Sequence, residues 1–164
     1  MITLPMLRSV AVGLILSVTA AIRGEEVARF GQADASAINE MIDRYSLAFQ
    51  KKDYSALPDY LGTPFIIFPS APKPIETMEA LIQHYRNVRD PLDARGYDHS
   101  KYGRTRITAL AADRALVNKT YRRFKKDGTV LEENAVIYLV SKTSGSWKIY
   151  GAFSQGVPYF GAVF

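Results

Sequence analysis

Apolar side chains recur at helical spacing in two segments of the first half of the chain. The first segment follows Ser36 and the second follows Thr77, and both side chains suit a helix N-cap. Within each segment the apolar residues lie three and four positions apart, which is typical of an amphipathic helix. Pro91 is expected to end the second helix because proline has no backbone N–H. The two apolar stripes consist of Ile38, Met41, Ile42, Tyr45, Ala48 and Phe49, and of Met78, Leu81, Ile82, Tyr85 and Val88.

The pattern of the second half predicts long strands joined by tight turns. The turn sequences are "AADR", "KDG" and "KTSGS", each rich in residues that favour turns. Shorter elements are expected between the two helices. Helices followed by hairpins indicate an α+β fold, with the helices packed on one face of an antiparallel sheet. The strands are predicted at 97–110, 115–125, 130–141 and 147–153, and the shorter elements are a helix within 51–61, a strand within 63–70 and an edge segment at 71–75.

The turn "KDG" sets the expected register of the central hairpin. Gly128 suits the left-handed position of a three-residue loop, so Lys125 is expected to face Thr129. This register places Arg122 opposite Glu132. Side chains alternate between the two faces of a strand, so a one-residue slip would exchange the faces. The face of Arg122 is expected to carry Asn118, Thr120, Glu132, Asn134, Tyr138, Trp147 and Phe153, and the opposite face Arg104, Arg106, Lys119, Arg123 and Lys125.

Composition narrows the possible chemistry. The 164-residue chain has a net charge of +5, which favours acidic partners only weakly. It has no cysteine, so disulfides, thiol nucleophiles and thiolate metal sites are excluded. The two histidines, His84 and His99, are too few for a histidine-rich metal cluster, and no metal or other cofactor is expected. His84 is expected at the rim of the domain.

The N-terminal segment differs from the rest of the chain. A basic residue, Arg8, precedes an apolar run over 10–22, and small residues follow near Ala20. This layout is typical of a secretory signal peptide, although a packed N-terminal helix is the alternative. We therefore expect a signal peptide or helix at 1–24, a linker at 25–35, the domain at 36–157 and a tail at 158–164. The protein is expected to be exported if the segment is cleaved, and cytoplasmic otherwise.

Two longer stretches carry a resemblance to a known superfamily. They are "INEMIDRYSLAFQKKDYSALPDYL" and "TYRRFKKDGTVLEENAVIYLVSKTSGSWKIYGAF". Together with the order of elements, they resemble the nuclear transport factor 2-like superfamily, and within it the small SnoaL-like (polyketide-cyclase-like) bacterial domains. The resemblance implies a strongly curved antiparallel sheet, wrapped into a cone around about three helices, with a pocket at its open end. It also implies a homodimer that forms through the outer face of the sheet.

Steroid delta-isomerases of this superfamily offer a test of activity. Tyr45 matches their oxyanion-stabilising tyrosine on the first helix. The positions of their two catalytic carboxylates fall at about Phe68 and Val136, which carry no acid. Steroid isomerisation is therefore not expected.

The favoured function is the binding of a small organic ligand, with an anionic ligand as one option and isomerase, cyclase or hydrolase activity left open. Arg122, held by Glu132, could bind a ligand carboxylate or polarise a carbonyl. The alternative is a non-enzymatic, dimeric interaction or stability domain whose cone is filled by its own side chains. Nucleic-acid binding is a distant third because no recognition motif accompanies the basic residues. The candidate ligand-binding residues are Tyr45, Asn118, Thr120, Arg122, Glu132, Asn134, Tyr138 and Phe153.

Overall fold

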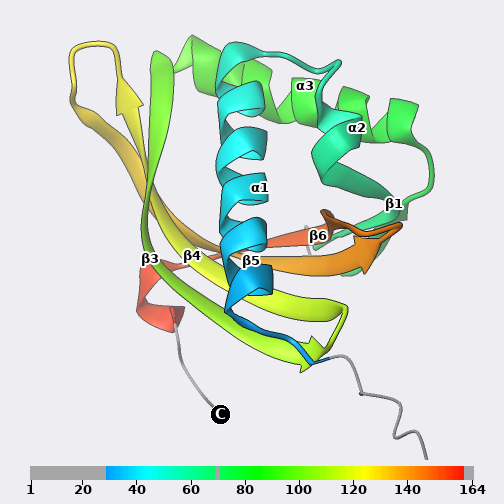
Figure 1. The fold of residues 1–164 in the computed structure, drawn as a ribbon. Coiled ribbons are helices and arrows are strands. Elements are labelled where there is room, and N and C mark those ends of the chain that lie inside the picture. Colours follow the sequence, from blue (N-terminus) through cyan, green and yellow to red (C-terminus); the bar gives the residue numbers. More distant parts are fainter. Residues whose placement is uncertain (1–28, 69–70, 161–164) are drawn as a thin grey trace, which may run out of the picture.

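A computed structural model describes residues 29–68 and 71–160, and the expected signal segment at 1–24 lies outside them. The chain forms three α-helices, a six-stranded sheet and a short 3-10 helix within these residues (Figure 1). In the described part of the chain, none of the helices has the length and apolar character needed to cross a bilayer. The elements are α1 (Gln32–Lys51), α2 (Leu57–Tyr60), β1 (Leu61–Ile67), β2 (Lys73–Ile75), α3 (Met78–Ala94), β3 (Tyr97–Ala111), β4 (Arg114–Lys125), β5 (Val130–Thr143), β6 (Ser146–Gln155) and η1 (Val157–Tyr159).

The sheet has the strand order β2-β1-β6-β5-β4-β3. All neighbouring strands are antiparallel except β1 and β6, which run parallel. The sheet curls without closing, and α1 lies across its concave side while α3 covers one end (Figure 1). The predicted α+β cone is therefore confirmed, and the four predicted long strands all form, with ends that differ by no more than two residues.

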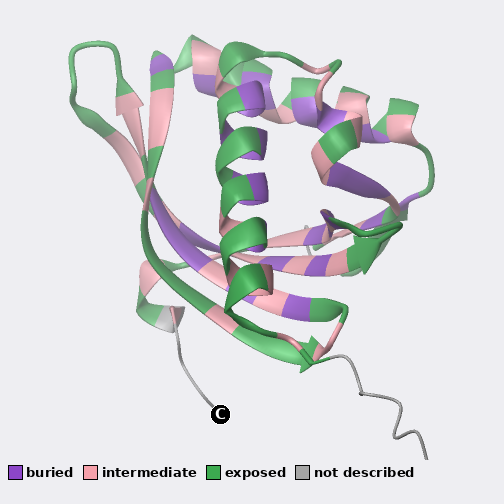
Figure 2. Cartoon of the chain, viewed as in Figure 1, coloured by how far each residue is buried: buried purple, intermediate pink, exposed green. Residues whose placement is uncertain are grey.

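Helix α1 presents its predicted apolar stripe to the core, and the buried positions lie along one side of the helix (Figure 2). The helix begins at Gln32, several residues before the expected start after Ser36. Asp34 explains the early start, because its carboxylate accepts a hydrogen bond from the backbone N–H of Gly31 at 3.1 Å. The same carboxylate accepts hydrogen bonds from Lys142 Nζ at 3.0 Å and from Trp147 Nε1 at 3.3 Å. These bonds join the first turn of α1 to the β5–β6 hairpin.

Helix α3 continues past Pro91 to Ala94, so the expected end at Pro91 is wrong. The last turn is stabilised by the burial of Leu92 and by the ion pair of Arg89 with Asp93, whose Nε–Oδ1 distance is 2.6 Å. These contacts offset the cost of Pro91, which removes the backbone hydrogen bond that an N–H at this position would donate.

Arg89 is the main polar link between α3 and α1. Its side chain is only 5% exposed, and its Nη1 atom donates to the carbonyl oxygens of Phe49 and Gln50 at 3.1 Å each. These carbonyls belong to the last turn of α1, where a positive charge is favourable, and the Phe49 carbonyl also accepts from the backbone N–H of Lys52 at 3.2 Å. The guanidinium also stacks over the Tyr97 ring at 4.3 Å, which brings β3 into the same contact.

The central hairpin follows the predicted turn but not the predicted register. Lys125 N donates to Thr129 O at 2.9 Å and Gly128 has a φ of +85°, as expected for the "KDG" loop. A β-bulge then follows, because Phe124 faces Val130 whereas Arg123 faces Glu132, and Leu131 is skipped. Arg122 consequently faces Glu133, and the predicted pair of Arg122 with Glu132 is wrong.

Burial of apolar side chains accounts for this bulge. It turns Ala115, Val117 and Tyr121 of β4 toward the helices, and all three are buried. The predicted register would have turned these residues outward and placed polar residues of the same strand in the core. The bulge leaves one residue unpaired. In return, the hairpin keeps its favourable turn, and the apolar side chains of β4 face the core.

The last hairpin is also tighter than predicted. Thr143 faces Ser146, so the loop has two residues, whereas strands predicted to end at 141 and to start at 147 left a longer loop. Ser144 and Gly145 have φ values of +51° and +82°, the combination required by the two-residue turn that best matches strand twist.

We expect Arg89→Met to lower the free energy of unfolding by about 3 kcal/mol, because it removes the side-chain donor of the Phe49 and Gln50 carbonyls and one of the two cations that pair with Asp93. Urea denaturation measures the change. Arg86→Met is the matched control on the same helix, since Arg86 is exposed and contacts only the Tyr54 ring at 4.4 Å among its described interactions. It should cost less than about 1 kcal/mol. Equal losses in the two variants would contradict the role given to Arg89.

Candidate functional site

A cavity of about 150 Å³ lies between α1, α3 and the concave face of the sheet. Its inner part is formed by buried aromatic and apolar side chains, and its mouth by partly exposed ones. The buried residues are Tyr45, Ser46, Phe49, Phe65, Tyr85, Tyr121, Val136 and Tyr138. The more exposed residues are Ile67, His84, Val88, Ser100, Tyr102, Arg123, Ala152 and Ser154.

Five tyrosines line this cavity, and we call them the tyrosine cluster: Tyr45, Tyr85, Tyr102, Tyr121 and Tyr138. Their rings meet edge to face, with centroid distances of 5.8 Å between Tyr45 and Tyr85 and 6.1 Å between Tyr45 and Tyr138. This geometry is the favourable one for aromatic pairs. The hydroxyl oxygens of Tyr102 and Tyr138 lie 2.9 Å apart and share a hydrogen bond. The cluster therefore combines an apolar wall with phenol hydroxyls.

The phenols of the cluster stay protonated at neutral pH. Burial raises the pKa of Tyr102 to about 12, and burial raises the pKa values of Tyr45 and Tyr138 well above the ordinary value. Burial also raises the pKa of Tyr85. A protonated phenol can donate a hydrogen bond to an oxygen of a bound molecule, but it cannot act as a phenolate base.

His84 lies at the mouth of the cavity beside Tyr85, with ring centroids 5.7 Å apart. Burial, and then the charge of Lys73, lower the pKa of His84 below its ordinary value. The imidazole is therefore neutral at pH 7, and one of its ring nitrogens can accept a hydrogen bond or a proton.

Arg123 is the cation of the cavity mouth. Its guanidinium lies over the Tyr121 ring at 5.0 Å and donates from Nη1 to Glu132 Oε1. Glu132 also accepts from Arg95 Nη1 at 2.8 Å, so two arginines share one carboxylate. Burial alone would raise the pKa of Glu132, but the charges of Arg123 and Arg95 outweigh it and hold the pKa below its ordinary value.

The structure separates the predicted site residues into three groups. Tyr45 and Tyr138 line the cavity. Glu132 and Asn134 lie on the concave face near the mouth, where they face Arg123 and Tyr121 across the hairpin. The remaining four lie on the outer face or its edge, away from the cavity: the bulge at Leu131 places Asn118, Thr120 and Arg122 there, and the register of β6, where Phe153 faces Ile137, places Phe153 there.

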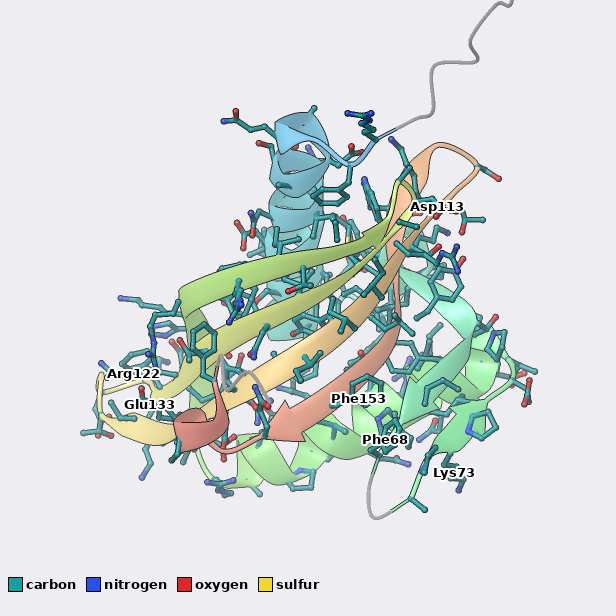
Figure 3. All side chains as sticks on the ribbon, turned by 90° about the horizontal axis from the view of Figure 1, so that it is seen from below. Phe68, Lys73, Asp113, Arg122, Glu133 and Phe153 are labelled. Atoms are coloured by element: carbon teal, nitrogen blue, oxygen red, sulfur yellow. The ribbon has the colours of Figure 1, made fainter. Side chains whose placement is uncertain are left out.

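Each of these four outer residues has a local partner. Figure 3 shows Arg122 beside Glu133 and Phe153 beside Phe68, and the Arg122 Nε–Glu133 Oε2 distance is 2.9 Å. Asn118 Oδ1 accepts from Gln155 Nε2 at 2.9 Å, and Thr120 Oγ1 accepts from the backbone N–H of Arg104, also at 2.9 Å.

The predicted basic outer face is wrong in part for the same reason. Lys119 and Arg123 turn toward the helices, and Lys119 is 3% exposed with its Nζ atom 4.7 Å from the centre of the Tyr102 ring. Arg104 stays on the outer face, with its guanidinium over the Phe160 ring at 4.5 Å. The basic residues are thus divided between two faces and do not form the single patch that the sequence suggested.

The curled, open sheet with helices across its concave side defines a cone-shaped α+β domain of the NTF2-like type. Residues 33–156 match the family described as NTF2-like protein (DUF6841), and the protein belongs to this family. No curated protein matches the chain.

Solved structures share the fold at low sequence identity. A Nostoc punctiforme protein of unknown function with a cystatin-like fold is 18% identical, with a TM-score of 0.63 over 82% of this chain and 99% of its own. An NTF-2 like protein of unknown function from Shewanella oneidensis is 16% identical, with a TM-score of 0.58 over 73% and 97%. A Novosphingobium aromaticivorans protein, provisionally named a scytalone dehydratase, is 13% identical, with a TM-score of 0.58 over 75% and 83%. These likenesses establish the fold and assign no activity.

A double-mutant cycle on Arg123→Met and Glu132→Gln should give a coupling energy of about 1–3 kcal/mol, because both side chains are less than 20% exposed. The cycle on Arg122→Met and Glu133→Gln should give less than about 1 kcal/mol, because that pair is 58% and 40% exposed. Urea melts of the single and double variants measure both energies. A third cycle on Arg122→Met and Glu132→Gln should give no coupling, and a large value would mean that the bulge is absent.

Proposed function

We propose that the domain binds a small organic molecule, of the size of a single ring, in the cavity lined by the tyrosine cluster. The observation that carries this proposal is an internal space of about 150 Å³ on which several polar groups converge. An engineered apolar cavity of about this volume accommodates benzene. Sites for drug-sized ligands usually have about 300–1,000 Å³, so a steroid exceeds the available space.

The wall of the cavity favours a flat ring that carries an oxygen. The aromatic rings of Tyr45, Tyr85 and Phe65 offer edges and faces for packing. The neutral phenols offer hydrogen-bond donors, and an acceptor oxygen on the ligand would satisfy them. A ring with a carbonyl, hydroxyl or carboxyl group fits both features better than a plain hydrocarbon does.

Binding is favoured over the chemistry of the steroid isomerases. No aspartate or glutamate is among the described residues that line the cavity. Val136 provides an apolar part of the wall, and Phe68 is 49% exposed and packs against Phe153. The positions of both isomerase carboxylates are therefore occupied by apolar side chains. A neutral His84 is the one group of the cavity suited to accept a proton at pH 7 among the described residues.

A second proposal concerns the homodimer expected from the family resemblance. Leu116 faces Leu139 across β4 and β5 on the outer face, and Ile137 lies two residues further along the same face. All three side chains are only partly buried. An uncharged aliphatic surface suits contact with the same surface of a second copy, as a two-fold symmetric dimer requires.

The ligand proposal is tested by thermal unfolding with phenol, benzyl alcohol, 2-naphthol and estradiol. A single-ring compound at ten times its Kd should stabilise the protein by about 1.4 kcal/mol and raise Tm by roughly 3–6 °C. The two larger compounds should leave Tm unchanged. Ala152→Leu should fill the cavity and abolish the shift, whereas Phe153→Leu, one residue along on the outer face, should preserve it. No shift with any single-ring compound would refute the proposal.

The dimer proposal is tested by light scattering coupled to size-exclusion chromatography. The wild-type protein should elute with twice the mass of one chain. Leu139→Glu should yield a folded monomer because it places a charge in the contact. Leu47→Glu, at a 50% exposed position of α1, is the control and should remain dimeric. A monomeric wild-type protein would exclude this dimer.

A further inference from the structure

The side chain of His84 lies at the mouth of the cavity. His84 precedes Val88 by four residues on α3, and residues at this spacing share one side of a helix. Both residues line the cavity, as does Tyr85, whose ring lies 5.7 Å from the imidazole ring. The imidazole is only partly buried. It is therefore within reach of a molecule that enters the cavity from solvent.

The ring nitrogens of His84 have no hydrogen-bond partner within the part of the chain that the structure describes. Tyr85 contacts the imidazole through its ring, and Lys73 of β2 acts on it through charge alone. Among the described residues, the one side-chain polar atom that is both buried and unpaired belongs to Arg123. Both nitrogens of His84 are therefore accessible to water, and a bound molecule can replace the water at one of them.

The neutral imidazole provides the cavity with a hydrogen-bond acceptor. One of its nitrogens carries a proton, and the other accepts. No carboxylate or side-chain amide is among the described residues that line the cavity. Two serine hydroxyls of the wall already have partners: Ser46 Oγ accepts from Gln50 Nε2 at 3.0 Å, and Ser100 Oγ lies 2.8 Å from the hydroxyl oxygen of Tyr97. His84 is therefore the group of the wall best suited to accept from a ligand.

The inner part of the cavity suits the ring of a ligand. Ring contacts lead from His84 to Tyr85, from Tyr85 to Tyr45 at 5.8 Å, and from Tyr45 to Tyr138 at 6.1 Å. The hydroxyls of Tyr138 and Tyr102 already share a hydrogen bond of 2.9 Å. A ligand ring can pack against these aromatic edges and faces, which leaves its polar substituent at the mouth. The volume of about 150 Å³ limits the ligand to a single ring.

The charges near the mouth favour a neutral donor over a cationic one. Lys73 acts on His84, and Arg123 forms part of the cavity wall. The carboxylate of Glu132 is shared by Arg123 and Arg95, so the group as a whole stays positive. An ammonium group on the ligand would be repelled there, whereas a hydroxyl carries no charge. A carboxylate has no proton to donate to the imidazole.

We propose that His84 determines the specificity of this cavity by accepting a hydrogen bond from the ligand, and that the ligand class is a neutral, single-ring hydroxy compound. This inference rests on the proposed function and narrows it. Any ring with an oxygen satisfies the proposed function, but only one with an O–H group satisfies His84.

The test uses NMR titration of the full chain at pH 7 with phenol, anisole and toluene. Anisole keeps the oxygen without the O–H group, and toluene replaces the hydroxyl by a methyl group. Phenol should bind at least about fivefold more tightly than anisole. His84→Leu should lower this ratio by at least about fivefold, while the affinity for toluene changes less than about twofold. His84→Gln keeps an acceptor oxygen and should preserve most of the preference for phenol.

Protonation of His84 gives a second readout, which altered packing would not reproduce. An imidazolium has no acceptor, so the affinity for phenol should fall as the pH decreases from about 7 to about 5, while that for anisole and toluene stays constant. Lys73 stays charged in this range, and two arginines hold the pKa of Glu132 below its ordinary value. His84→Gln should remove the pH dependence. Gln83→Leu, at an exposed neighbouring position outside the cavity wall, is the control and should behave as the wild type.

The outcomes distinguish this inference from the proposed function. If phenol and anisole bind equally to the wild-type protein, or if His84→Leu leaves their ratio unchanged, the role of His84 is overturned while the cavity remains a ligand site. Equal weakening of all three compounds by His84→Leu would assign the effect to packing and also overturn that role. If none of the three compounds binds the wild-type protein, both proposals fail.

Discussion

The contact of the Arg89 guanidinium with the last carbonyls of α1 is the interaction on which the rest of the structure depends. It fixes the angle between α1 and α3, and its stacking on Tyr97 fixes both helices against the start of β3. Tyr45 and Phe49 approach the cavity from α1, and His84 and Tyr85 approach it from α3. The space between these side chains is therefore defined by one buried charge whose Nε and Nη1 atoms both donate to acceptors, and a buried arginine is tolerated only when it is paired in this way.

Helices and strands could be predicted from the sequence because each repeats a local pattern. The stripe from Ile38 to Phe49 is buried as expected, and the turn at Gly128 has the expected backbone. Local patterns do not determine how two strands align beyond a turn. The bulge at Leu131 lies only a few residues from that turn, and it reverses which side chains of β4 face the helices. The apolar alternation of Ala115, Val117 and Tyr121 was the signal that could have indicated it.

The candidate site was predictable only where a residue sits on a helix stripe or on a strand whose face does not depend on the bulge. Tyr45 belongs to the first kind, and Tyr138 lines the cavity because β5 also turns its apolar side inward. Arg123 was assigned to the outer face, because the basic run over 119–126 gives no indication of which side chains are inside. Tyr85 was predicted as a core residue. Its place in the cavity wall depends on tertiary packing, which brings α3 over the sheet (Figure 1).

The position of Trp147 has a consequence for spectroscopy. It is the only tryptophan in the sequence, and it lies where the first turn of α1 meets the β5–β6 hairpin, with its indole N–H on Asp34 and its ring against Phe30 at 5.9 Å. The cavity wall contains five tyrosines and no tryptophan among its described residues. Intrinsic tryptophan fluorescence of this protein therefore reports the docking of the N-terminal helix, whereas tyrosine absorbance averages over ten tyrosines, of which five line the cavity. The tryptophan signal follows one defined part of the domain without any label.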